Sequence, residues 1–211
     1  MHANVRTILV IFMASTILAS PASAIELVDY VGYAYETGGL PPSQPGDELV
    51  FTCVATAVSP VTGVDLTTSE VTFYISGLTS PGDTTDEFGN TFVAYSSGTI
   101  EVRADGSQNA SWGIDPPNAT APSTFTDGDL LFSGTFNSFV LVVQPNGSGV
   151  FEGMIDATGG SLVSEVCNDC GYTFGGGWSA GASAQLPEGY DLQIDGKLIV
   201  NEAVSADQSS W

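Results

Sequence analysis

Basic residues are almost absent from this sequence, and it contains a single histidine. Of its 211 residues, three are Lys or Arg and 24 are Asp or Glu, which gives a formal net charge of −21. Nucleic-acid binding depends on Lys and Arg placed against phosphate, so that class of function is excluded. The same deficit argues against anionic membrane surfaces and phosphorylated substrates as partners.

The first 24 residues have the composition of a secretory signal peptide. A charged start with His2 and Arg6 precedes an apolar run, Ile8–Leu18, and small residues at Ala22 and Ala24 form an A-x-A cleavage site. The apolar run is too short to span a bilayer. We therefore expect a protein that is secreted or displayed on the cell surface, with the periplasm as the alternative. We expect no membrane insertion of the mature chain.

Loss of this leader would remove the only histidine, and with it several kinds of chemistry. Arg103 and Lys197 would be the remaining basic residues against 24 acidic ones, a net charge of −22. Ser-His-Asp and Cys-His hydrolases need an imidazole, as do most catalytic zinc, copper and iron sites. No G-x-S-x-G elbow, P-loop or dinucleotide fingerprint is present. A pair of carboxylates is the enzymatic option that survives.

Short β-rich runs bounded by Gly, Pro, Asn or Asp recur along the chain, which is typical of all-β proteins. Residues 70–77 alternate apolar and polar side chains with the period of two of a half-buried strand, and 49–58 and 160–166 are read as strands as well. Asp-Gly or Asn-Gly pairs predict turns at 104–108, 144–149 and 194–197.

These runs predict an all-β fold, an antiparallel β-sandwich of jelly-roll type. The proline-rich segment 113–129 is then a long connection between the two sheets. The expected organisation is a signal peptide over 1–24, one sandwich domain over 25–204 and a flexible tail over 205–211.

The phrases "PSTFTDGDLLFSGTF" and "GYDLQIDGKLIVNEAV" carry a resemblance. With the glycine-rich strands between them, they resemble uncharacterised secreted bacterial β-proteins, a loose group whose members often end in a surface-sorting tail of the PEP-CTERM kind. The resemblance covers roughly residues 98–204, and no Pro-Glu-Pro motif or basic end accompanies it. It implies an exported β-rich protein and no particular activity.

Three cysteines are present, and their spacing favours a local disulfide. Cys167 and Cys170 stand three apart ahead of a glycine-rich run, which is unlike the helix that follows a redox CxxC motif. Three cysteines without histidine cannot build a four-ligand zinc site. We expect a Cys167–Cys170 bridge with Cys53 as a buried apolar residue; pairing of Cys53 with either of the other two is the alternative.

Acidic residues in loops could serve calcium, which selects carboxylate and carbonyl oxygens. Solvated acidic turns that keep the chain soluble are the simpler interpretation. Two loops, 81–90 and 126–129, supply the candidate Ca²⁺ ligands Asp83, Asp86, Glu87, Asn90, Asp127 and Asp129.

Candidate catalytic and ligand-binding residues are few. Glu152 and Asp156 share one face of a predicted strand about 13 Å apart, at about 3.3 Å per residue, and Glu101 is a third acidic candidate. The aromatic residues Trp112, Trp178 and Tyr30 could stack on sugar rings, although aromatics on strands more often lie in a core. The sequence thus predicts a non-enzymatic binding or structural module for extracellular polysaccharide or cell-surface components, with a two-carboxylate carbohydrate hydrolase as the alternative.

Overall fold

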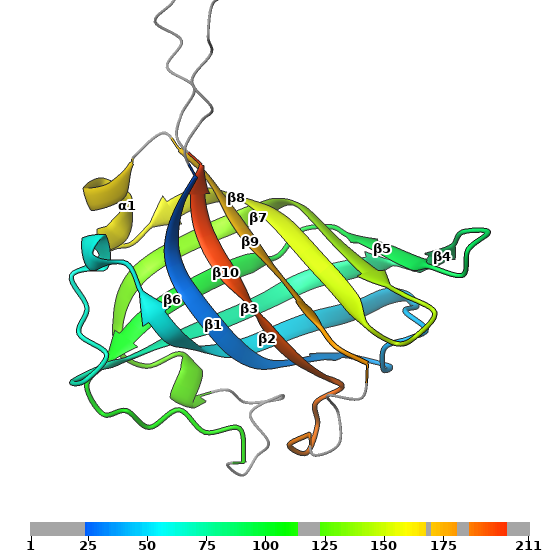
Figure 1. Cartoon of the computed structure of the whole chain (residues 1–211), viewed down its shortest axis with the longest axis horizontal. Helices are drawn as coiled ribbons and strands as arrows, with labels where there is room; N and C mark the ends of the chain where they lie inside the picture. Colours follow the sequence, from blue (N-terminus) through cyan, green and yellow to red (C-terminus); the bar gives the residue numbers. More distant parts are fainter. Residues whose placement is uncertain (1–23, 114–122, 168–169, 181–185, 202–211) are drawn as a thin grey trace, which may run out of the picture.

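The computed structural model describes residues 24–113, 123–167, 170–180 and 186–201. Ten strands account for most of this part of the chain (Figure 1). Their bounds are β1 Ala24–Glu36, β2 Pro45–Val58, β3 Glu70–Pro81, β4 Thr84–Thr85, β5 Thr91–Tyr95, β6 Thr99–Asp105, β7 Asp129–Val143, β8 Gly149–Gly159, β9 Gly171–Trp178 and β10 Leu192–Asn201. The helical elements are η1 Pro60–Thr62, η2 Ser123–Phe125 and α1 Ser161–Val166.

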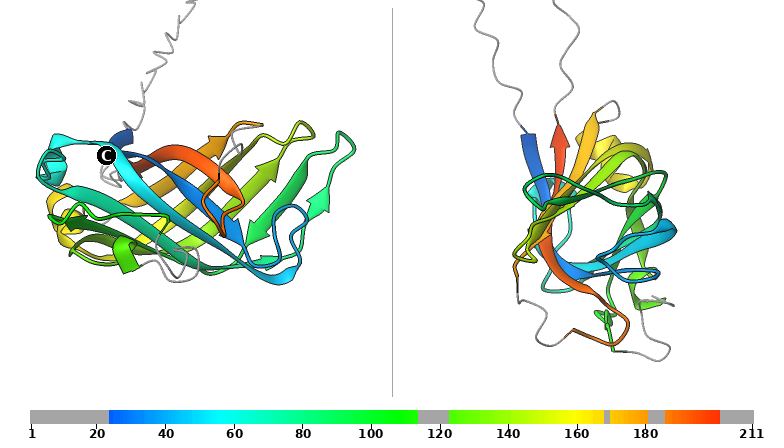
Figure 2. Two further views of the ribbon diagram at one scale, coloured as in Figure 1. Left: turned by 90° about the horizontal axis from the view of Figure 1, so that it is seen from below. Right: turned by 90° about the vertical axis from the view of Figure 1, so that its right-hand side faces the viewer.

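The strands form one antiparallel sheet that closes into an eight-stranded barrel. Pairing follows chain order from β1 through β2, β3, β6, β7, β8 and β9 to β10, and β10 then pairs with β1. Closure removes the open edges that a flat sheet would expose. The additional strand β5 pairs with the second half of β7 while β6 pairs with the first half, and β4 pairs with β5. Viewed from one end, the strands surround a single interior (Figure 2).

Aromatic side chains fill that interior. Alternate residues of each strand point inward, so that Phe51, Phe73 and Phe174 are fully buried. The Tyr30 ring stacks on the Phe174 ring at a centroid distance of 4.7 Å, and the Phe151 ring lies 5.5 Å from the Phe174 ring. The barrel interior is therefore a packed core like that of other small barrels.

One end of the barrel carries α1 and η1, and the buried Leu162 of α1 packs into the core (Figure 1). The Cys167–Cys170 disulfide, with an S–S distance of 2.04 Å, links the chain leaving α1 to the start of β9. At the opposite end Trp178 is nearly buried, and its indole N–H donates to the Gly147 carbonyl at 2.9 Å. Both barrel ends are thus held by side chains from neighbouring loops.

The all-β prediction is confirmed, and the finer sandwich prediction is not. A jelly roll needs strands that cross between two sheets, whereas here chain neighbours pair in order around a closed barrel. Residues 161–166, expected as a strand, form the helix α1. The turn predicted at 194–197 lies inside the continuous strand β10. The predicted leader, apart from Ala24, and the predicted tail over 205–211 lie outside the described residues.

Candidate functional site

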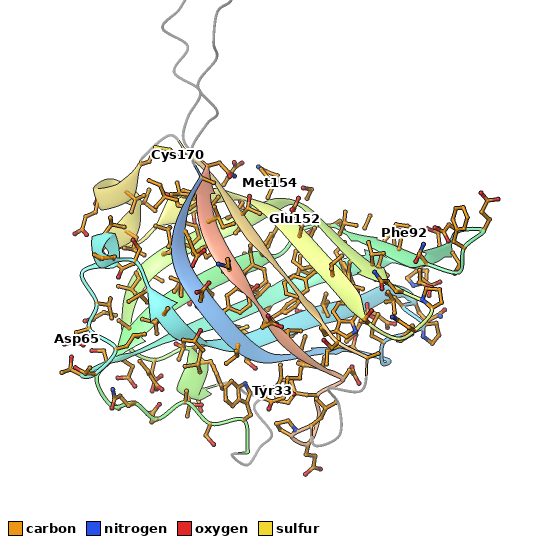
Figure 3. The ribbon with its side chains drawn as sticks, in the orientation of Figure 1. Tyr33, Asp65, Phe92, Glu152, Met154 and Cys170 are labelled. Atoms are coloured by element: carbon orange, nitrogen blue, oxygen red, sulfur yellow. A yellow bond between two sulfur atoms is a disulfide. The ribbon has the colours of Figure 1, made fainter. Side chains whose placement is uncertain are left out.

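The outer surface of the barrel has two contrasting walls. The first, which we term the covered wall, comprises the outward residues Tyr33, Tyr35, Thr52 and Thr72 of β1, β2 and β3. Segments from the β6–β7 and β9–β10 connections pack on it and bring Trp112, Phe125 and Tyr190 over these strands (Figure 3, where Tyr33 marks this wall).

Specific contacts fix this cover. The Trp112 indole N–H donates to the carbonyl and the hydroxyl of Thr52, at 3.2 and 3.1 Å. The Tyr190 hydroxyl lies 2.7 Å from the same Thr52 hydroxyl, and burial raises the pKa of Tyr190. Phe125 is fully buried, 5.3 Å from the Trp112 ring. These contacts give the outer face of β1–β3 a small core of its own.

The second wall, which we term the bare wall, carries exposed apolar side chains. It comprises the outward residues of β5, β7, β8 and β9, namely Phe92, Val140, Val142, Val150, Met154, Gly175 and Gly177. Val142 stands opposite both Phe92 on β5 and Val150 on β8, so the three side chains form one cross-strand row. Val150 is 52% exposed, Val140 40% and Met154 39%. Phe92, Glu152 and Met154 are labelled on this side of the barrel in Figure 3. No side chain in the described part of the molecule covers this row.

A groove of about 720 Å³ runs along β9 at this wall. Val140, Val142 and Val150 line one side of it, and β10 residues Asp195 and Lys197 line the other. The floor of the groove is the backbone of β9, because glycine stands at 175 and 177, where side chains would otherwise project outward. The groove is therefore an open depression in the outer surface of the barrel.

The glycine at 175 is not required by packing, whereas the glycine at 177 is, because a Cβ there would lie 2.7 Å from the Gly149 carbonyl. A Cβ at Gly175 would lie 3.5 Å from its nearest neighbour, the Phe151 carbonyl, which is an ordinary contact. By contrast, a Cβ at Gly196 would lie 2.2 Å from the Gly175 carbonyl and 2.5 Å from the Tyr30 hydroxyl. Glycine inside a strand weakens it, and it often marks a place where another molecule approaches the backbone closely.

Charged groups border the groove unevenly. Lys197 forms ion pairs with Glu26 and with Asp29, the latter at 3.3 Å, so its charge is already matched. Glu152 and Asp195 stand on opposite sides of β9, and both side chains are exposed. Within the described ranges, neither carboxylate has a hydrogen-bond or ion-pair partner. The groove therefore has two unmatched negative charges at its rim.

The three candidate catalytic carboxylates do not come together. Glu152 lines the groove, and Asp156 lies four residues along the same strand outside it. Glu101 is on β6 and forms an ion pair with Arg103 at 2.9 Å. The carboxylate that shares the groove with Glu152 is Asp195, which sequence reasoning did not select.

The candidate calcium ligands lie at two opposite ends of the barrel. Asp86 accepts a side-chain hydrogen bond from Asn90 and backbone N–H bonds from Asn90 and Phe88. These bonds shape the turn and lower the pKa of Asp86. Asp83 accepts the Ser43 N–H at 3.3 Å, and Glu87 is exposed. Asp127 and Asp129 border the start of β7 at the far end. Among the described residues, no group of three His, Cys, Asp or Glu side chains could hold a metal ion.

The three candidate stacking aromatics lie in packed surroundings. Tyr30, proposed as a ligand platform, lies in the barrel core at 1% exposure, and its hydroxyl donates to the Gly175 carbonyl at 3.0 Å. Trp178 closes one end of the barrel and borders a second pocket of about 350 Å³ with Leu40 and Leu192. Trp112 belongs to the cover described above. Tyr30 is therefore closed to a ligand, and the Trp178 and Trp112 rings each pack against neighbouring residues.

A buried acid, which sequence reasoning missed, lies where β1 ends. The Glu36 Oε1 atom accepts the Tyr95 hydroxyl at 2.9 Å and lies 2.6 Å from the Ser43 hydroxyl. Its Oε2 atom is buried and has no hydrogen-bond partner in the described structure. Burial raises the pKa of Glu36; hydrogen bonds from Ser43 and Tyr95 oppose this shift, and the charges of Asp47 and Asp191 add to it.

The predicted cysteine pairing is confirmed, with Cys167 joined to Cys170 and Cys53 free and buried in the core.

No protein-family model, curated protein sequence or solved structure matches the chain. None of the helices that the structure describes has the length and apolar character needed to cross a membrane.

The bare wall was missed because alternation shows which side chains point outward and does not show what covers them. A usable signal was nevertheless present in the run from Val150 to Asp156. Its outward positions are Val, Glu, Met and Asp, so two of four are apolar where a solvated strand would be polar.

Proposed function

We propose that this protein is an exported, non-enzymatic binding module, acting outside the cell or at its surface, and that the bare wall is its binding face. The observation that carries the proposal is the cross-strand row of exposed apolar side chains beside an open groove. Contiguous exposed apolar surface on a folded protein marks an interaction site more often than scattered single residues do.

The packed interior supports an outside site. Barrels that hold small ligands keep a cavity within the sheet, whereas here aromatic rings occupy that space. The covered wall supports the same conclusion by contrast. Outward aromatic side chains of β1 are shielded there by the chain's own loops, and the apolar residues of the bare wall receive no such cover from described residues.

A carbohydrate hydrolase is the second candidate, because Glu152 and Asp195 flank the same groove. Their strands are two strand spacings apart, about 10 Å, and the two residues are also offset by two positions along the strands, which is wider than the separation of about 6.5–9.5 Å between carboxyl groups in inverting glycosidases. Such an enzyme needs one of the two acids held protonated by apolar surroundings. Both side chains are exposed instead, which favours binding without catalysis.

The binding proposal does not depend on calcium. The loop around Asp86 is held by its own hydrogen bonds, and it lies apart from the groove-lining residues. Calcium bound in that loop would stabilise the hairpin of β4 and β5 without supplying a contact to the groove.

The test compares wild-type protein with Gly175→Val, which fills the groove, on immobilised ligands of several chemistries. Neutral polysaccharides, basic peptides and acidic peptides are assayed for binding, with reducing-sugar release measured in parallel. We expect at least one class to bind the wild type, to bind the variant at least about tenfold more weakly, and to be released unchanged. Sugar release that Glu152→Gln abolishes would establish the hydrolase instead. If no class distinguishes the variant from the wild type, the bare wall is not a binding face.

A further inference from the structure

We propose that the bare wall docks a basic amphipathic peptide segment of a partner protein. This inference rests on the proposed function, because it names the partner class for the same face. Three observations carry it: the apolar row, the glycine floor of the groove, and the unmatched carboxylates at its rim.

The apolar row and the glycine floor select a chain with projecting apolar side chains. The groove follows β9 between β8 and β10, which are about 10 Å apart across two strand spacings. A peptide segment laid along β9 can insert apolar side chains above Gly175 and Gly177 and pack them against Val140 and Val150. Main-chain approach is also possible there, since β9 presents no side chain larger than Thr173 on this face.

The rim charges select a basic segment. Glu152 and Asp195 stand on opposite sides of the floor and lack partners among the described residues, while Lys197 is already paired with Glu26 and Asp29. Lys or Arg side chains flanking the apolar face of a peptide would reach both carboxylates. Complementary charge of this kind increases the association rate and fixes the register of binding.

The net charge disfavours three other occupants. With a formal charge of −21, a second copy of the chain would be repelled, and the same holds for acidic peptides and anionic lipid surfaces. A neutral polysaccharide would meet no electrostatic barrier, yet it would leave Glu152 and Asp195 unmatched. The open aromatic platforms that commonly hold sugar rings are also missing from the groove lining.

The experiment uses synthetic amphipathic peptides of Leu and Lys as the probe, with fluorescence anisotropy at low and high salt. Two control peptides have the same length: one replaces Lys with Glu, and one keeps the Leu/Lys composition in a scrambled order. Gly175→Val fills the groove, and its matched control is Gly171→Val, which lies on the same strand outside the groove with open space at its Cβ. Glu152→Gln with Asp195→Asn removes the rim charges, and Glu165→Gln with Glu188→Gln removes two exposed charges elsewhere.

We expect the Leu/Lys peptide to bind wild-type protein, with affinity that falls at high salt. Gly175→Val and the rim-charge pair should each weaken binding at least about tenfold, whereas both matched controls should bind like the wild type. Equal binding of the scrambled or the Glu peptide would overturn the inference.

Failure of this inference and failure of the proposed function are distinguishable. If neutral polysaccharide or zwitterionic vesicles bind in a Gly175-dependent way and the Leu/Lys peptide does not, the basic peptide is the wrong partner and the binding face stands. If no probe responds to Gly175→Val, both proposals are wrong.

Discussion

The covered wall and the bare wall belong to the same closed sheet, yet other segments of the chain cover the outward residues of the first and leave those of the second exposed. On the covered wall, the described segments of the connections after β6 and β9 pack on β1–β3, and Phe125 and Tyr190 are buried there. On the bare wall, the β7–β8 turn at 144–148 is too short to fold back over its own strands. In this barrel, the outer face that carries the β6–β7 and β9–β10 connections is covered, and the face beside the short β7–β8 turn is open.

The largest difference in stability should come from removing one phenylalanine ring from each wall. Phe125→Ala deletes a fully buried ring and should cost about 3–5 kcal/mol of the free energy of unfolding. Phe92→Ala on the bare wall, where the ring is 37% exposed, should cost no more than about 1 kcal/mol. Chemical denaturation of both variants measures the difference. Equal costs would mean that the bare wall is as tightly packed as the covered one.

A smaller effect should distinguish two glycines on adjacent strands. Gly196→Ala forces a Cβ against the Gly175 carbonyl and the Tyr30 hydroxyl and should cost about 1–3 kcal/mol. Gly175→Ala makes only ordinary contacts and should be neutral, or stabilising by about 0.5–1 kcal/mol. Thermal melts of the two variants test this contrast. Marked destabilisation by Gly175→Ala would show that packing, and not ligand approach, requires that glycine.

The smallest effect concerns pH, and it compares the buried Glu36 with the exposed Glu152 of the bare wall. Because burial raises the pKa of Glu36 in the folded state, the folded protein binds this proton more tightly than the unfolded chain does. The contribution of Glu36 to the free energy of unfolding should therefore be fully present below pH 4.5, the ordinary pKa of a glutamate. It should be lost as pH rises through the raised pKa of the folded state.

Glu36→Gln should remove that decline, and denaturation midpoints measured across acidic to neutral pH would show it. Glu152→Gln is the matched control, since its side chain is exposed and should change stability by less than about 0.5 kcal/mol. A wild-type profile parallel to that of Glu36→Gln would contradict the assignment.

Local patterns in the sequence predicted the strands well. The alternation of Val71, Phe73 and Ile75 placed those side chains correctly in the core, and the spacing of Cys167 and Cys170 predicted their disulfide. Six residues of α1 are too few to show a helical period, so the sequence pattern predicts a strand over 160–166 where the structure has a helix.

Long-range contacts were beyond the reach of those patterns. The Asp195-Gly196 pair predicts a turn because glycine tolerates positive φ. In the structure a Cβ at Gly196 would clash with the Gly175 carbonyl and with the Tyr30 hydroxyl, which come from strands distant in sequence. Closure through the β1–β10 pair joins residues near the two ends of the described chain, and nothing local distinguishes it from a sandwich. The groove likewise depends on which face the loops cover.

The central claim is that ligands meet the bare wall, and amide chemical-shift mapping during titration with the Leu/Lys peptide tests it most directly. The predicted result is a set of shifts at the β8, β9 and β10 amides around Val150, Gly175 and Asp195, with the Trp112 and Trp178 indole signals unchanged. Shifts concentrated at those two indoles would place the ligand on the covered wall or at the barrel end and would contradict the account.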